Sequence, residues 1–245
     1  MDIIGHRGRV GHPEEDENTV PAVAAALAEG ADGVEVDVRL SADGVPVCVH
    51  DRDLWRLTGK RVDVQSLSYA ALSRLALRGN GPIAALEALI EHVQDRALLV
   101  LDLKGDADPP ARLVGATVAT LRRARLGERV VMSSFWPEIL AESQRVAPQL
   151  RRALITEPHV PAAAAVRRAL AMPGTDVHLH LRAVLSDHSP VGQAVDAGRA
   201  VRCWTVNRPA DARLLGIAGV TAVITDDPGG LRRSLGRQGT SAVAV

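Results

Sequence analysis

Two acidic residues, Glu35 and Asp37, stand one position apart inside an apolar run that covers 33–40. Side chains two positions apart on a β-strand project from the same face, so this spacing sets both carboxylates side by side. Carboxylates this close repel each other unless positive charge lies next to them. Either a divalent cation or neighbouring arginines could supply it, and carboxylate oxygens suit Mg²⁺ or Ca²⁺.

A histidine, His50, is expected beside these carboxylates because of a hairpin. The dipeptide Asp43-Gly44 is a turn signal between two apolar runs, the second of which ends at His50. Residues whose numbers sum to about 86 then face each other, which sets His50 near Val36. The imidazole could ligate a cation, transfer protons or be an ordinary polar strand end, and Asp51 could hold its ring or cap the loop.

A second histidine, His6, ends another apolar run and is followed by Arg7. Two histidines that flank a cation suit in-line displacement at phosphorus. One histidine takes the proton of the nucleophile and the other protonates the leaving oxygen. Arg7 and Lys104 would then bind the phosphoryl oxygens, arginine as a fork and lysine as a point charge. A cation would offset the charge that builds on those oxygens.

These side chains need a fold that gathers the ends of several strands. Short apolar runs alternate with helical stretches rich in Ala, Leu and Arg, which indicates a parallel sheet with helices outside. So many units in roughly 230 residues favour a closed (β/α)8 TIM-type barrel over an open sheet. The predicted strands cover 2–5, 33–40, 45–50, 98–103, 129–133, 151–155, 176–179, 200–206 and 222–225. The predicted helices cover 20–29, 83–93, 111–123, 137–145, 161–171, 192–197 and 210–215.

Nine strand-like runs are one more than a barrel needs, so we interpret the hairpin at Asp43-Gly44 as an extension of one barrel strand. Asn18 or Thr19 is expected to cap the first helix. The prediction is one domain, 1–245, with a small irregular and polar insertion at about 54–80 after the His50-Asp51 strand. The tail 231–245 is expected to fray.

Composition excludes several classes of function. Lys+Arg and Asp+Glu both number 29, and no basic surplus for a nucleic-acid backbone is present. Two cysteines cannot form a disulfide framework, so we expect packed thiols. The N-terminus lacks the pattern of a signal peptide, and no apolar run reaches about 18 residues. The cytoplasm is the expected location, without stable membrane insertion, and the oligomeric state is left open.

Several short segments combine these features along nearly the whole chain. They are Gly5-His6-Arg7-Gly8, Glu17-Asn18-Thr19, Gly33-Val34-Glu35-Val36-Asp37-Val38, Asp43-Gly44-Val45-Pro46-Val47-Cys48-Val49-His50-Asp51, Leu103-Lys104, Ser133-Ser134-Phe135, Cys203-Trp204-Thr205-Val206-Asn207 and Ile224-Thr225-Asp226-Asp227-Pro228. In this order they resemble the glycerophosphodiester phosphodiesterase family, within the phospholipase C-like phosphodiesterase barrels. Any one of these segments is weak evidence for the family, whereas all of them in this order are strong evidence for it.

The resemblance implies a TIM-type barrel that hydrolyses glycerophosphodiesters to glycerol 3-phosphate and an alcohol. His6 and His50 look like the acid/base pair of that reaction. In such families the glycerol 2-hydroxyl of the substrate is thought to attack phosphorus, which gives a cyclic phosphate that water opens. This agrees with the residues themselves, which include no obvious protein nucleophile.

The resemblance also implies that Glu35 and Asp37 bind one divalent cation, Mg²⁺ or Ca²⁺, and that Arg7 and Lys104 contact the phosphate. One position departs from the family. The third ligand is usually a Glu two residues before the lysine, and here it is Asp102. Because its arm is one methylene shorter, the cation must shift or a water must bridge, and we keep Asp102 as a ligand.

A second departure precedes Glu17, where Asp16 replaces the family's usual proline. Most of the acidic run 14–17 is expected to face solvent, whereas Glu17 could reach Arg7 or the site. Trp136 stands where a small polar residue is common. It is either a lid contact or a packing residue at a helix start, and we favour packing.

Other polar residues at strand ends have two interpretations each. Trp204 could form an apolar wall for glycerol or belong to the core. Asp226 could orient a histidine or Arg7, or cap the following turn. His178 and His180 share a strand face and could form a metal pair, but one of them lining the pocket fits better with a carboxylate cation site.

Two other functions remain open at this point. A lysophospholipase D or sphingomyelinase D type of phosphodiesterase would need an aromatic or apolar rim for membrane contact, and the chain has only five aromatic residues. A non-catalytic phosphodiester-binding barrel would be favoured by loss of either His6 or His50, and both are present. The leaving alcohol is not predicted.

Overall fold

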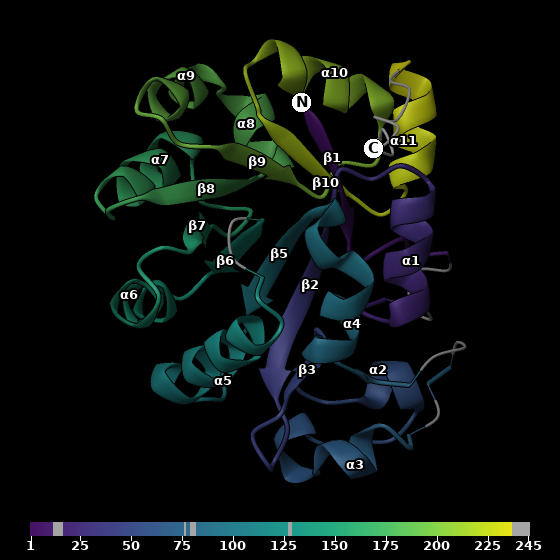
Figure 1. Ribbon diagram of the computed structural model, residues 1–245. Helices are drawn as coiled ribbons and strands as arrows, with labels where there is room; N and C mark the ends of the chain where they lie inside the picture. The colour runs from purple at the N-terminus through teal and green to yellow at the C-terminus, as the bar shows by residue number, and fades with distance from the viewer. Residues whose placement is uncertain (12–16, 76, 79–81, 127–128, 237–245) are drawn as a thin grey trace.

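The computed structural model describes residues 1–11, 17–75, 77–78, 82–126 and 129–236. Eight parallel strands form a closed barrel with helices around its outside (Figure 1). The barrel strands are β1 Asp2–His6, β2 Gly33–Leu40, β5 Leu98–Leu103, β6 Val130–Ser134, β7 Arg151–Ile155, β8 Thr175–His180, β9 Val201–Trp204 and β10 Ala222–Thr225. Their order is β1-β10-β9-β8-β7-β6-β5-β2, and a β1–β2 pairing closes the ring. The predicted (β/α)8 barrel is therefore confirmed.

The outer helices follow the strands along the chain. They are α1 Val20–Ala28, α4 Leu86–Val93, α5 Pro110–Arg123, α6 Pro137–Val146, α7 Ala162–Leu170, α8 Leu181–Ser186, α9 Ser189–Asp196, α10 Pro209–Ile217 and α11 Pro228–Leu235, with a 3₁₀ turn, η2 Gln94–Arg96, after α4. Helix α8 was not predicted, because it begins directly after β8 with no turn residue between them. Thr19 caps α1 by accepting a hydrogen bond from the amide of Ala22, as one of the two predicted caps.

Apolar side chains fill the barrel interior below the rim where the strands end. Ile4 and Val100 belong to a buried cluster inside the ring. Because side chains alternate along a strand, the residues two positions further on, His6 and Asp102, point to the same interior. The barrel thus places polar groups on an apolar floor at the C-terminal ends of its strands.

The predicted hairpin has the predicted register. Strand β3, Pro46–Cys48, runs antiparallel to β2 and pairs Cys48 with Val38. The amide of Val49 continues the pairing by donating to the carbonyl oxygen of Asp37 at 3.1 Å. Strand β3 also pairs with β4, Ala84–Ala85, which falls at the start of the predicted helix 83–93. That helix begins only at Leu86.

The described part of the insertion is ordered rather than irregular and polar as predicted. It contains α2 Trp55–Thr58, η1 Val64–Ser66 and α3 Tyr69–Leu72, which lie together at the bottom of Figure 1. They bury an apolar cluster against β3 that includes Val47, Leu54, Leu57, Val64 and Leu72. Apolar residues spaced among the polar ones thus give this short segment a small core of its own. The single-domain organisation stays a prediction.

The expected fraying from Leu231 is not seen in the described part of the tail. Helix α11 continues to Leu235, because Asp227 caps its first turn by accepting from the amide of Gly230 at 2.9 Å. Arg232 also donates to Asp32 at 2.6 Å. Residues 237–245 lie outside the described residues.

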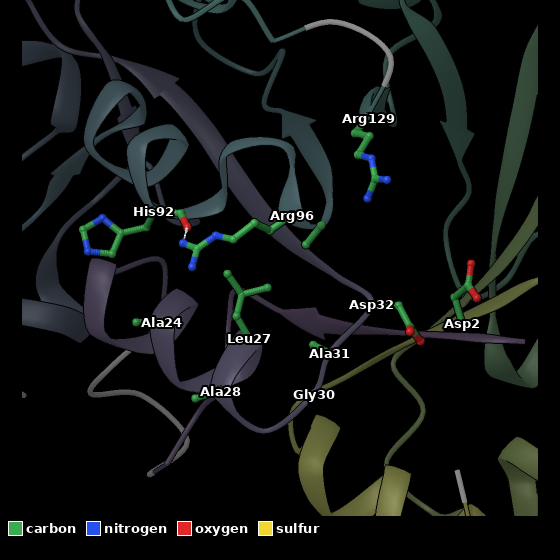
Figure 2. A pocket seen from close by; sticks show the side chains of 11 residues that line it. Asp2, Ala24, Leu27, Ala28, Gly30, Ala31, Asp32, His92, Arg96 and Arg129 are labelled. Carbon is green, nitrogen blue, oxygen red and sulfur yellow. Dashed lines mark hydrogen bonds between the residues drawn. The ribbon is translucent and has the colours of Figure 1, made fainter. Parts of the chain in front are cut away.

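A cavity of about 660 Å³ opens at the other end of the barrel, where the strands begin. Figure 2 shows Arg96 at the left of it, Arg129 at the upper right, and the carboxylates of Asp2 and Asp32 at the right. Barrel enzymes place their chemistry at the opposite end, where the strands finish. In the part of the chain that the structure describes, no helix has the length and apolar character needed to cross a bilayer.

Candidate active site

A smaller cavity, of about 120 Å³, lies at the C-terminal ends of the barrel strands. All eight residues that the sequence predicts to touch substrate or cation line this cavity. Its lining is His6, Arg7, Glu35, Asp37, His50, Asp102, Lys104, Ser133, Phe135, Ile155, His178, Trp204 and Ile224. The four residues predicted to support the site, Glu17, Asp51, His180 and Asp226, do not line this cavity and each contacts a side chain that does.

Three buried carboxylates converge at the floor of this cavity. One oxygen each from Glu35, Asp37 and Asp102 lies within 4.8 Å of the others. The parallel register explains this, because Asp37 on β2 is the direct partner of Asp102 on β5. Burial raises the pKa of Glu35, and the charges of Asp37 and Asp102 raise it further. Burial also raises the pKa of Asp102. The ionised trio therefore needs positive charge.

Two side-chain cations meet part of that need. The Lys104 ammonium lies 2.7 Å from Asp37 Oδ1 and contacts Asp102 Oδ2, and Arg7 Nε lies 3.2 Å from Asp37 Oδ2. Although burial alone would raise the pKa of Asp37, the charges of Lys104 and Arg7 lower it far below its usual range. Burial tends to lower the pKa of Lys104, but the two aspartates raise it overall.

The charge balance and the free oxygen favour a further cation. When all three carboxylates are ionised, Arg7 and Lys104 do not balance their charge, because Arg7 is shared with Glu17. Asp102 Oδ1 is buried and has no hydrogen-bond partner among the described residues. An all-oxygen donor set of this kind fits a hard divalent cation such as Mg²⁺ or Ca²⁺.

Asn18 holds Asp37 from the side and was not predicted to do so. Its Nδ2 donates to Asp37 Oδ2 at 2.8 Å, and its Oδ1 accepts from the Asp37 amide at 2.9 Å. Its backbone has φ 58°, a left-handed conformation that asparagine tolerates better than most residues. The sequence pattern favours a helix cap at this position, so it gives no sign that Asn18 contacts Asp37.

We expect Asn18→Ala to weaken binding of the divalent cation by about 10–100-fold, because removing a partner that orients a ligand usually has this effect. Titration of metal-free protein with Mg²⁺ and with Ca²⁺, followed calorimetrically, measures the change. Gln193→Ala, an exposed amide on α9, is the control. Unchanged affinity in Asn18→Ala would show that Asp37 needs no such support.

Each of the two histidines has a carboxylate behind its ring. His50 Nδ1 lies 2.8 Å from Asp51 Oδ1, and His6 Nδ1 lies 2.7 Å from Asp226 Oδ1. Asn207 donates to the other oxygen of Asp226 at 2.6 Å. A carboxylate only accepts, so each Nδ1 donates in this tautomer. This leaves Nε2 of both rings available to exchange a proton with a ligand.

These contacts lower the pKa of both carboxylates. The hydrogen bond with His50 lowers the pKa of Asp51, against the effect of burial. Burial alone would raise the pKa of Asp226, but its hydrogen bond with His6 lowers it overall. Both carboxylates therefore stay ionised beside their imidazoles and can fix the orientation of the ring.

An aromatic wall closes one side of the cavity. Trp204 meets Phe135 edge-on at 5.7 Å and His180 at 5.1 Å. His180 Nδ1 accepts from the amide of Arg182 and so caps α8. His178 is buried with Nε2 3.4 Å from Arg202, and burial together with that charge lowers its pKa. One of the two histidines thus lines the pocket as expected, and it is His178, whereas His180 reaches the pocket only through Trp204. Among the described residues neither histidine belongs to a metal cluster.

Glu17 reaches Arg7, as was considered possible. It is buried and accepts from Arg7 Nη1 at 3.0 Å, while Arg56 holds it from the other side. Arg56 was not among the predicted residues. Trp136 packs against the apolar core beside Gly105, which confirms packing over a lid contact. The rest of the acidic run, 14–16, lies outside the described residues.

Known proteins resemble this chain in sequence and in fold. The family model described as "Glycerophosphoryl diester phosphodiesterase family" matches residues 6–230. A "Probable glycerophosphodiester phosphodiesterase 1" of Mycobacterium tuberculosis is 29% identical, over 93% of this chain and 89% of the relative. A Silicibacter pomeroyi structure of a putative glycerophosphoryl diester phosphodiesterase has 28% identity and TM-score 0.83, covering 96% of this chain and 93% of that one.

A third comparison includes a bound product. The structure of an Oleispira antarctica phosphodiesterase in complex with the product sn-glycerol-3-phosphate superposes with TM-score 0.85 at 26% identity. The match covers 97% of both chains. The whole barrel, and not one segment of it, is therefore shared with these proteins.

Proposed function

Because the chain belongs to the glycerophosphoryl diester phosphodiesterase family, we propose that it hydrolyses glycerophosphodiesters to glycerol 3-phosphate and an alcohol. The observation that carries this proposal is the meeting of His6, His50 and the carboxylate trio in one cavity. The product in the Oleispira antarctica relative supports glycerol 3-phosphate as the product here.

The two histidines would do the proton transfers. One Nε2, of His6 or His50, takes the proton of the substrate's glycerol 2-hydroxyl, and that oxygen attacks phosphorus. The bond from phosphorus to the leaving alcohol breaks, and the other imidazole gives its proton to the alcohol oxygen. Water then opens the cyclic phosphate with the two roles exchanged. Asp51 and Asp226 keep the rings in the orientation that this exchange needs.

The remaining residues would bind the substrate. Arg7 and Lys104 contact the phosphoryl oxygens, and Trp204 forms the apolar wall against glycerol. Glu35, Asp37 and Asp102 would hold one divalent cation, Mg²⁺ or Ca²⁺, which supplies positive charge to the phosphoryl oxygens as they become more negative.

Release of glycerol 3-phosphate from glycerophosphocholine and glycerophosphoethanolamine tests the proposal. Activity should disappear with a chelator and return with Mg²⁺ or Ca²⁺, because the carboxylate trio then regains its cation. Turnover restricted to micellar lysolipid would contradict it in favour of a lipid phosphodiesterase. Absence of turnover on all these phosphodiesters would favour a barrel that only binds them.

A further inference from the structure

We propose that Arg56 in the insertion is a positioning residue that holds both flanks of the active site, Asp51 behind His50 and Glu17 behind Arg7. This inference rests on the proposed function, since it assigns His50 and Arg7 the roles given above.

The guanidinium of Arg56 uses all three of its nitrogens on these two carboxylates. Nε donates to Asp51 Oδ2 at 2.6 Å. Nη1 donates to Glu17 Oε2 at 2.9 Å, and Nη2 donates to Glu17 Oε1 at 2.6 Å. The contact with Glu17 is thus a two-point fork, a geometry that arginine provides and lysine does not.

Each of the two carboxylates also holds a residue of the site. The second oxygen of Asp51 meets His50 Nδ1, and Glu17 Oε2 is shared with Arg7 Nη1. The five side chains form one chain of contacts, and Arg56 is the link in its middle. Its loss would separate the histidine flank from the phosphate-binding flank.

The apolar cluster of the insertion fixes the position of Arg56. Arg56 lies on α2, and Leu57 beside it packs into the buried cluster with Val47 of β3 and Leu54. Strand β3 leads within two residues to His50. Arg56 and His50 are therefore carried by segments that share one apolar cluster, so the distance between them is set by packing.

The charges around Glu17 show what loss of Arg56 would do. Glu17 is buried, and among the residues that the structure describes its cationic partners are Arg7 and Arg56. Arg7 also lies against Asp37 in the carboxylate trio. Without Arg56, Arg7 would be the remaining partner of Glu17 and would be drawn away from Asp37 and from a phosphate. Asp51 would at the same time lose the contact that fixes it behind His50.

A double-mutant cycle tests the inference on glycerophosphoethanolamine. Arg56→Ala should lower kcat by about 10–100-fold and raise KM, because a misplaced catalytic group costs this much. Added to His50→Ala, it should leave kcat within about threefold of His50→Ala alone, because its effect through the His50 ring is already lost. The rise in KM should persist in the double mutant, because Arg56 still acts there on Arg7 through Glu17. Arg52→Ala is the matched control, because Arg52 lies in the same segment and pairs with Asp63 at the surface.

Folding is checked separately by thermal unfolding, and Arg56→Gln, a smaller change, must show the same pattern in kcat and KM. Arg56→Lys keeps the charge without the fork and should remain impaired. Effects of Arg56→Ala and His50→Ala on kcat that multiply would overturn the inference, as would full activity in Arg56→Lys. Wild-type kinetics in Arg56→Ala would overturn it while leaving the proposed function intact. A wild-type protein inactive on every glycerophosphodiester overturns the proposed function and this inference together.

Discussion

Replacing His50 by alanine should lower turnover of a glycerophosphodiester by about 10²–10⁴-fold while the fold stays intact, because proton transfer by a positioned side chain contributes this much. The ring lies in the cavity with its Nδ1 held by Asp51, so the substitution removes the imidazole from this flank of the site. Steady-state kinetics with circular dichroism on the same preparation measures both properties. His6→Ala should behave similarly, because Asp226 holds that ring in the same way.

His188→Ala is the control, since His188 is exposed and lies outside the cavity lining. A second substrate, the p-nitrophenyl ester of glycerol 3-phosphate, identifies the role of His50. Its leaving group needs little protonation, so a defect confined to the unactivated ester would make His50 the general acid. Full activity of His50→Ala on both esters would exclude His50 from catalysis.

Glu35→Gln should lower affinity for the divalent cation by more than about 100-fold and lower turnover with it. Removing a direct ligand should cost more than removing a residue that only orients one, for which about 10–100-fold is usual. The physical reason is that the trio keeps its geometry but loses one of the three charges that hold the cation. Calorimetric titration with Mg²⁺ and Ca²⁺, with metal content after gel filtration, measures the binding.

Glu138→Gln on α6 is the matched control, because that carboxylate is exposed and distant in sequence from the trio. The backbone amide of Arg7 donates to Glu35 Oε2 at 3.0 Å. Because Arg7 is proposed to bind the phosphate, we also expect Glu35→Gln to change KM slightly. Unchanged cation affinity in Glu35→Gln would remove Glu35 from the ligand set and leave Asp37 and Asp102 to be tested alone.

The sequence predicts the barrel and the position of the carboxylates well, because both depend on patterns among residues that are close in the sequence. The alternation of side chains fixes that Glu35 and Asp37 share a face, and the turn at Asp43-Gly44 fixes the hairpin register to the residue. Register and period are properties of the nearest few residues, so they can be predicted before any tertiary contact is known.

The supporting contacts could not be predicted in the same way. Of the 29 basic residues only Lys60 and Lys104 are lysines, so arginine is common along the whole chain. An arginine at position 56 therefore does not by itself indicate a role in the site. Asn18 stands where a helix cap is expected, and its contact with Asp37 depends on a left-handed backbone. The strand at 84–85 is too short for alternation to indicate it.

The closure of the barrel has a consequence for biosynthesis. Strand β1 pairs on one side with β2 and on the other with β10, so His6 near the start of the chain receives Asp226 only after some 220 further residues are made. A nascent chain on the ribosome can form β1 and β2 early, yet the His6 ring lacks its carboxylate until β10 emerges. Hydrolytic competence should therefore arise only once β10 and Asp226 have been made, rather than growing with chain length.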